Sequence, residues 1–390
     1  MLKKFPFKIT FWNSVGFVII AFGVYSAILR YTRGLGAVTN LSDTFPWGLW
    51  IGFDILCGVG LAAGAFTICA VTHIFHIEKF KPLTRPTILT AFLGYAFVAL
   101  ALMFDLGKWY NIWHPLIMWN PASVMFEVAW CVMLYLTVLF LEFLSFALQK
   151  FNWVKTLNII RKAIVPIYIL GIILSTLHQS SLGSLYLIVP FKMYPLWYTS
   201  FLPYYFYISA ISVGFVMIIF ESYLSARAFG HGLNINLLSR VAKIAYVFLI
   251  ITVLAKFIDL TLENKLGYLF LNLPETYFFW GEIFIGFIIP IALLSRREVR
   301  ESRFWLYITS IFVIAGFLFN RLNVSITSLM RSSGVEYFPS IYEIGITMML
   351  VTVGIWLFSL LSNYFPVFEH EEEVHRELNE EYKSEGLIAH

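Results

Sequence analysis

Residues 48–76 read GLWIGFDILCGVGLAAGAFTICAVTHIFH, and Asp54 is their single acidic or basic side chain apart from the histidines at the end. A hydrocarbon core about 30 Å thick takes roughly 20 helical residues to cross, and this run is longer than that. The run is apolar throughout and does not alternate every second residue, so it does not suit a strand of a membrane barrel. The stretch therefore predicts a membrane-spanning helix.

The rest of the chain repeats this pattern. Apolar residues make up 59% of the sequence and charged residues 13%, and the mean hydropathy is +0.79, far from the values of water-soluble domains. The sequence therefore predicts an all-α integral membrane protein, with a short N-terminal segment at 1–10, a membrane domain at 11–363 and an acidic tail at 364–390. About ten transmembrane helices are expected, the other nine over 11–30, 87–106, 122–149, 162–178, 204–227, 238–259, 276–295, 303–322 and 341–363.

The positions of the basic residues predict the orientation. Most of the 27 lysines and arginines lie at the N-terminus, in the even-numbered loops and in the C-terminal tail. By the positive-inside rule both termini are expected in the cytoplasm, with the chain in the inner (cytoplasmic) membrane. The first apolar run lacks a small-x-small cleavage site, so it is predicted to stay as a helix. The net charge of +4 reflects the loops and gives no sign of nucleic acid as a partner.

The cysteines and histidines argue against a metal centre. Cys57, Cys69 and Cys131 lie in apolar runs without CxxC spacing, which predicts small buried side chains and no iron–sulfur cluster, zinc or covalent haem. A haem b needs two histidines at one depth. His178 is expected near the outer side and His73 near the inner side, almost the full hydrocarbon thickness apart. His114, in an outer loop beside Pro115, is a weak second ligand.

Ionisable side chains inside a membrane cost a few kcal/mol each, so their positions are the best functional signal. Asp54 and Glu127 are expected about six residues, or roughly 9 Å, below the outer ends of their helices, with no cation nearby in the sequence. His178 opens a polar run at the end of its helix, where a helix cap is the structural alternative. Lys256 and Asp259, three residues apart, are expected to pair with each other. A supporting outer cluster is expected from Asp105, Lys108, Glu282 and Arg321.

The inner half holds few such groups, and they outline a possible proton path. Its candidate members are His73, Tyr135, Glu142 and Glu221, although ion pairs with inner-loop cations explain the two glutamates as well.

Carboxylates and a histidine beneath aromatic outer loops suit proton-coupled redox chemistry on a quinone. Each quinone oxygen gains or loses a proton with its electron, which requires protonatable groups, and the isoprenoid tail requires an apolar slot. The candidate quinone-binding residues are Asp54, Glu127, His178, Gln179, Trp47 and Tyr95.

Several motifs carry a family resemblance. They include Phe45-Pro46-Trp47-Gly48, Gly52-Phe53-Asp54, Ser123-Val124-Met125-Phe126-Glu127, His178-Gln179-Ser180-Ser181 and Tyr337-Phe338-Pro339. Together they resemble the NrfD and polysulfide-reductase type membrane subunits, and among these the HybB-type subunits of respiratory nickel–iron hydrogenases. The likeness runs from about residue 30 to residue 363.

This resemblance implies two four-helix bundles, formed by spans two to five and six to nine, with the first and last spans flanking them. It also implies a site for menaquinone or ubiquinone in the first bundle near the outer face. The implied partners are an extracytoplasmic ferredoxin-like iron–sulfur subunit and a catalytic subunit such as a nickel–iron hydrogenase. Coupled proton movement is a possible addition, and no haem or iron–sulfur cluster is expected in this chain.

Other classes of function remain as alternatives. A secondary transporter would bind its solute near the midplane between broken, repeated helices, and no matched pair of Gly/Pro-interrupted helices is evident. A haem-b membrane anchor would need the histidine pair considered above. A purely structural anchor would not need Asp54 and Glu127.

Overall fold

A computed structural model of the chain describes residues 10–151, 153–230 and 232–368. Within these ranges ten helical segments are long and apolar enough to cross a membrane, which confirms the predicted all-α membrane architecture. The described residues contain no β-strand beyond an isolated bridge between Ser42 and Phe45. The N-terminal segment 1–9 and almost all of the predicted acidic tail, from 369 onwards, lie outside the described residues.

Six spans are single helices, and four are made of consecutive pieces. The single helices are α1 (Phe11–Arg33), α5 (Val124–Lys150), α6 (Val154–Leu187), α7 (Leu202–Phe229), α8 (Ile235–Leu262) and α14 (Ile341–Tyr364). The second span joins η2 (Trp50–Ile55), α2 (Leu56–Leu61), α3 (Gly64–Cys69) and η3 (Ala70–Ile74), and the third joins η4 (Glu78–Leu83) to α4 (Thr84–Asp105). The eighth joins α9 (Pro274–Ile283), η8 (Phe284–Ile288) and α10 (Ile289–Ser295), and the ninth joins α12 (Arg303–Leu322), η9 (Asn323–Thr327) and α13 (Ser328–Ser333).

Four predicted boundaries were wrong by more than a turn. The third span was expected to begin at 87 and the fifth at 162, but they begin at Glu78 and Val154. Two spans also end later than expected. The fifth span was expected to end at His178 and the ninth at Leu322, but they continue to Leu187 and Ser333. Both continuations are polar, and hydroxyl groups there bond to carbonyls of the same helix, such as Ser181 to the Leu177 carbonyl. Because these side chains are satisfied inside the protein, a polar run does not end the helix.

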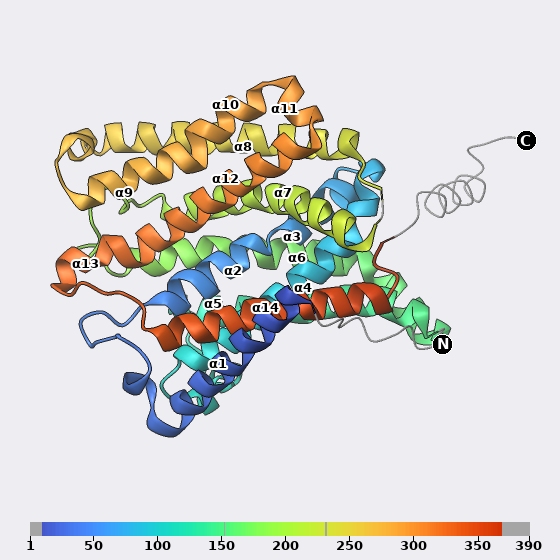
Figure 1. Ribbon diagram of the computed structural model, residues 1–390, viewed down its shortest axis with the longest axis horizontal. Helices are drawn as coiled ribbons and strands as arrows, with labels where there is room; N and C mark the ends of the chain where they lie inside the picture. Colours follow the sequence, from blue (N-terminus) through green and yellow to red (C-terminus); the bar gives the residue numbers. More distant parts are fainter. Residues whose placement is uncertain (1–9, 152, 231, 369–390) are drawn as a thin grey trace, which may run out of the picture.

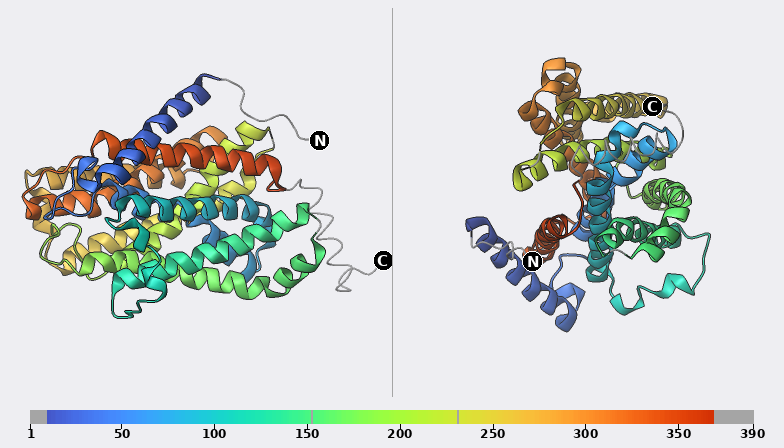
Figure 2. Two further views of the ribbon diagram at one scale, coloured as in Figure 1. Left: turned by 90° about the horizontal axis from the view of Figure 1, so that it is seen from below. Right: turned by 90° about the vertical axis from the view of Figure 1, so that its right-hand side faces the viewer.

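The spans form the two bundles that the resemblance implies. The second span packs with α4 and α6, and α5 packs with both of these helices; α7 packs with α8 and α12, on which the α9–α10 span also packs (Figure 1). Glycines allow the closest approaches: a side chain on Gly214 of α7 would meet Ala63 and Gly64 of the second span, and one on Gly316 would meet the backbone of Gly286. The helix α1 packs on α14, which in turn lies against α4 (Figure 2).

The even number of spans places the start of α1 and the end of α14 on the same side of the molecule (Figure 1). The opposite side carries the ends of α4, α6 and α8 together with α13, and it corresponds to the predicted outer face. We call these two sides the termini side and the loop side.

Candidate functional site

The interior of the first bundle contains a buried tyrosine–histidine pair. Tyr95 of α4 and His178 of α6 are both 0% exposed, and the Tyr95 hydroxyl lies 3.0 Å from His178 Nδ1. Tyr135 of α5 packs edge-to-face on Tyr95. One residue further on α6, Gln179 Nε2 donates to the Val59 carbonyl of the second span at 3.1 Å. His178 therefore lies inside a helix and not at its cap.

Polar atoms around this pair have unused hydrogen-bonding capacity. In the described part of the chain, several buried side-chain atoms on α6 lack a hydrogen-bond partner: His178 Nε2, Gln179 Oε1, Ser175 Oγ and the Tyr186 hydroxyl. Buried polar groups in folded proteins are nearly always paired. The adjacent His178 Nε2 and Gln179 Oε1 indicate a place where water or a polar ligand is held.

Asp54 lies away from this pair, on the wall of a separate cavity. Its carboxylate is 8% exposed, accepts a 2.7 Å hydrogen bond from Thr347 Oγ1 of α14, and borders an elongated cavity of about 550 Å³. No lysine, arginine or histidine among the described residues forms an ion pair with it. Gly94 and Val98 of α4 face this cavity while Tyr95 faces the bundle interior, so α4 separates Asp54 from His178.

Glu127 and Trp47 lie nearer the loop side. Glu127 is in the first turn of α5, which begins at Val124 and not at 122, and its side chain is exposed. Glu127 Oε1 accepts a 2.6 Å hydrogen bond from Ser181 on α6. The half-buried Trp47 packs edge-to-face on Tyr186.

The supporting outer cluster does not assemble in one place. Asp105 ends α4 beside Arg30, whose guanidinium donates to the carbonyls of Phe104 and Leu106 and so caps that helix. Lys108 is exposed in the following loop. Glu282 and Arg321 lie instead within the second bundle.

Glu282 is the centre of a network in that bundle. It is 0% exposed, forms an ion pair with Lys256, and accepts hydrogen bonds from Trp197, Asn320 and Asn323 at 2.9, 2.8 and 3.0 Å. The prediction that Lys256 pairs with Asp259 was wrong. Lys256 reaches across to the neighbouring helix instead, and Thr199 donates to Asp259 at 3.1 Å.

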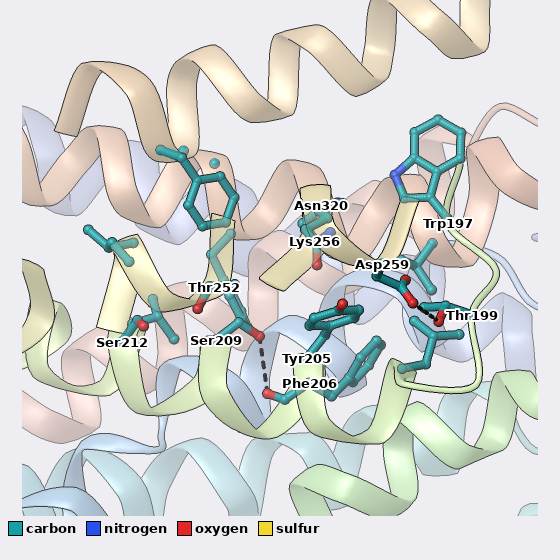
Figure 3. A pocket seen from close by; sticks show the side chains of 18 of the residues that line it. Trp197, Thr199, Tyr205, Phe206, Ser209, Ser212, Thr252, Lys256, Asp259 and Asn320 are labelled. Atoms are coloured by element: carbon teal, nitrogen blue, oxygen red, sulfur yellow. Dashed lines mark hydrogen bonds between the residues drawn. The ribbon is translucent and has the colours of Figure 1, made fainter. Parts of the chain in front are cut away.

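Figure 3 shows the cavity beside this network, with Lys256, Asp259 and Asn320 on its wall. Its volume is about 60 Å³, which is room for a few water molecules. Arg321 packs against two residues that line it, Phe206 and Ser209. Its guanidinium lies 3.6 Å from the centre of the Phe206 ring and donates to Ser209 Oγ at 2.8 Å.

The four residues predicted for an inner proton path do not all lie together. Tyr135, Glu142 and Tyr168 line one small enclosed space in the first bundle, and the His73 ring stacks on Tyr168 with 4.0 Å between centroids. Glu221 of α7 is not among them. It borders the 550 Å³ cavity, far along the helices from Asp54.

The described residues contain no group of three histidine, cysteine or acidic side chains placed to hold a metal ion. The three cysteines are buried and free. Of the described histidines, His73 and His178 lie in spans, and one stacks on Tyr168 while the other bonds to Tyr95. His76, a neighbour of His73, lies just beyond the end of the second span.

The sequence matches the family described as "Polysulphide reductase, NrfD" over residues 37–333, which covers the whole of both bundles. The chain belongs to the NrfD family. The family resemblance drawn from the motifs is thereby confirmed.

Relatives of this NrfD-family chain extend the match over nearly its full length. It is 38% identical to a protein of Nitratidesulfovibrio vulgaris (strain Hildenborough), covering 92% of this chain and 95% of that protein. It is 30% identical to the probable Ni/Fe-hydrogenase 2 b-type cytochrome subunit of Escherichia coli (strain K12), covering 87% and 88%. It is 28% identical to the menaquinone reductase integral membrane subunit of Nitratidesulfovibrio vulgaris (strain Hildenborough), covering 95% and 94%. The names of the last two are those of redox-enzyme subunits.

Some participating residues were missed from the sequence. Thr347, Ser181 and Asn323 act as hydrogen-bond donors to buried or predicted carboxylates, yet single hydroxyls and amides in apolar helices carry no pattern of their own. The buried Glu343 was detectable, because Ser340 and Glu343 form an S-x-x-E capping box at the start of α14.

Proposed function

We propose that this NrfD-family protein is the quinone-reactive membrane subunit of a respiratory oxidoreductase complex. The observation that carries the proposal is the set of protonatable side chains in and beside the first bundle that have no counter-charge. They are Asp54 on the cavity wall and the Tyr95–His178 pair in the interior. In a hydrocarbon environment such groups are costly, and they persist where chemistry uses them.

The chemistry requires these residue types. Reducing a quinone to a quinol adds two electrons and two protons, one proton to each ring oxygen, and oxidation of the quinol releases the same number. In our proposal Asp54 exchanges protons with the quinone ring, and the Tyr95–His178 pair, on the other side of α4, relays protons through the interior of the first bundle. Gln179 Oε1 supplies an unpaired acceptor nearby. Trp47 and Glu127 form the edge of the site toward the loop side.

The electrons come from or go to other subunits in this proposal. The names of the relatives, a menaquinone reductase subunit and a hydrogenase subunit, support a menaquinone- or ubiquinone-linked complex. We place an extracytoplasmic iron–sulfur subunit on the loop side and a catalytic subunit such as a nickel–iron hydrogenase beyond it. The chain then lies in the inner membrane with both termini in the cytoplasm, as its basic loops predict.

Proton movement toward the termini side is a finer part of this proposal. Tyr95, Tyr135 and Glu142 follow one another inside the first bundle, and Tyr168 and His73 continue toward the end of the second span. Glu221 offers a separate exit, since it also borders a polar cavity on the termini side that Lys79 and Arg303 line. Loss of pH-gradient formation in vesicles carrying Glu142→Gln, with quinone turnover retained, would support the first route, and an unchanged gradient would remove it.

The test of the function uses the complex purified from its native membranes. We expect co-purified lipid quinone, quinone-linked turnover, and no haem band in stoichiometric amount from this chain. A stoichiometric reduced-haem spectrum assigned to this subunit would favour a haem-b anchor. Solute uptake by vesicles holding the chain alone would favour a transporter.

A further inference from the structure

The cavity beside Asp54 runs along the helices for much of the membrane's depth. It is lined on α14 from Leu350 to Ser359, about 13 Å at 1.5 Å per residue, and on α7 from Met217 to Phe229. The second span forms its floor and α4 one side. We name it the inter-bundle groove, because α7 belongs to the second bundle and the other lining helices do not.

The lining of the inter-bundle groove is almost wholly apolar. Leucine, valine, phenylalanine and glycine dominate it, and among its lining residues no lysine, arginine or histidine occurs. The two acidic groups lie toward its ends. Asp54, held by Thr347, is toward the loop side, and Glu221 is toward the termini side. The groove is therefore an apolar channel with a hydrogen-bonding carboxyl group at the end nearest the proposed quinone chemistry.

The rims of the groove face outward. Val351 of α14 and Leu224 of α7 are 42% and 41% exposed, although both line the groove. These two helices lie apart from each other in the right-hand view of Figure 2. An occupant can therefore enter sideways, from the lipid, between α7 and α14.

We propose that the inter-bundle groove holds the isoprenoid chain of a lipid quinone, with the ring at Asp54 and the chain extending toward Glu221. This rests on the proposed function and adds where the chain lies and where the molecule enters. Polarity and charge favour this occupant over others. An apolar lining with a carboxyl group toward one end suits a molecule with a polar ring and a long apolar chain. A phospholipid is disfavoured, because its anionic phosphate would lie near Asp54 and the lining contains no lysine, arginine or histidine to bind it.

The test compares two quinones and two matched variants in the purified complex. Val351→Trp places a large side chain in the groove from its rim. Val165→Trp makes the same change on α6, at an exposed position that borders no described cavity. Each is assayed with a long-chain quinone and with the same ring lacking a chain, and its co-purified quinone is extracted and measured.

We expect Val351→Trp to raise KM for the long-chain quinone about tenfold, equivalent to roughly 1.4 kcal/mol, and to lose most of its co-purified quinone. Turnover of the chain-free quinone and the activity of Val165→Trp should match the parent complex. Equal KM values for the long-chain quinone in the two variants would overturn the assignment of the groove. Equal loss of both quinones in Val351→Trp would also overturn it, since a chain slot does not discriminate against a ring without a chain.

Leu224→Trp, on the opposite rim, repeats the comparison if Val351→Trp fails to assemble, as judged by the yield of the complete complex. The outcomes separate this inference from the function on which it rests. A parent complex that turns over neither quinone defeats both proposals. If the parent complex turns over both quinones and the rim variants do not discriminate between the two quinones, only the assignment of the groove is contradicted.

Discussion

In the second bundle, Glu282 is surrounded by four donors, Lys256, Trp197, Asn320 and Asn323, and its charge is neutralised inside the protein. In the first bundle, Asp54 has one hydrogen-bond donor, Thr347, and no ion-pair partner among the described residues. The space beside them differs as well. The cavity next to Lys256 has a volume of about 60 Å³, and the inter-bundle groove beside Asp54 about 550 Å³.

The difference in partners and in adjacent space indicates different roles for the two carboxyl groups: a structural role for Glu282 and a chemical role for Asp54. A buried carboxylate with a full set of partners is held in one protonation state and one position, so it stabilises helix packing. A buried carboxyl group with few partners and a neighbouring cavity is free to exchange a proton with a ligand. We therefore expect substitutions in the first bundle to affect turnover, and substitutions in the second bundle to affect assembly.

The largest effect is expected for Asp54→Asn. The amide keeps the shape and the hydrogen bond from Thr347 but cannot exchange a proton, and such general acid–base groups contribute about a hundred- to ten-thousandfold in rate. Quinone-linked turnover should fall by that factor. The partner's reaction with an artificial dye, which bypasses this subunit, should be unchanged.

Asp43→Asn is the matched control, because Asp43 is exposed in the loop before the second span. It should leave both assays at the parent level. If Asp54→Asn behaves like Asp43→Asn, Asp54 has no part in proton exchange and the contrast between the bundles fails.

The second-largest effect is expected for Lys256→Met, and it is an effect on stability. The substitution leaves the fully buried Glu282 without its cation, which typically costs about 3–5 kcal/mol. The measurement is the thermal unfolding midpoint and the yield of complex in detergent. The double variant Lys256→Met/Glu282→Gln should recover most of the loss, because it removes the orphaned charge and keeps an acceptor for Trp197 and Asn323.

The control for this pair lies on the surface. Arg297 and Glu301 form an exposed ion pair one turn apart, and removing it with Arg297→Met should leave the unfolding midpoint and the yield at the parent level. If the Lys256→Met complex is as stable as the Arg297→Met complex, the network around Glu282 does not stabilise helix packing in the second bundle.

The sequence predicts the ten spans because lipid leaves helices as the only way to pair the backbone of long apolar runs. It also indicates which ionisable groups are unusual, since a charged residue within an apolar segment can be recognised from the sequence alone. It cannot say which groups meet. Lys256 and Asp259 look like partners along one helix, yet Lys256 pairs with Glu282 on another, because helix rotation and neighbours are decided by packing. Likewise Asp54 and His178 were expected in one site, and α4 lies between them.

A smaller effect is expected for Tyr95→Phe. The substitution removes the hydroxyl that bonds to His178 Nδ1 and leaves that imidazole unanchored, and a hydrogen bond of this kind is worth about 0.5–1.5 kcal/mol. Quinone-linked turnover should fall roughly three- to tenfold, mainly in kcat, and its pH profile should change. Tyr205→Phe is the matched control, because it removes a hydroxyl hydrogen bond of the same length, to the Ala255 carbonyl, in the second bundle. Identical behaviour of the two variants would mean that Tyr95 does not orient His178.

The smallest effect is expected for Glu127→Gln. From the sequence alone Glu127 would be the most sensitive position, as a carboxylate deep in its helix with no cation near it. The structure places it in the first turn of α5, exposed and hydrogen-bonded to Ser181, and glutamine retains that bond. Because glutamine keeps the bond that positions this side chain, losing the carboxylate should lower turnover by no more than about threefold, well below the range for an obligatory acid or base. The measurement is quinone-linked turnover beside Asp54→Asn in the same preparation, with the dye reaction as control. A hundredfold loss in Glu127→Gln would mean that a partner subunit covers this edge of α5 and α6 in the assembled complex. The quinone ring would then belong between Glu127 and Ser181, and Asp54 with its groove would lose the role assigned to them.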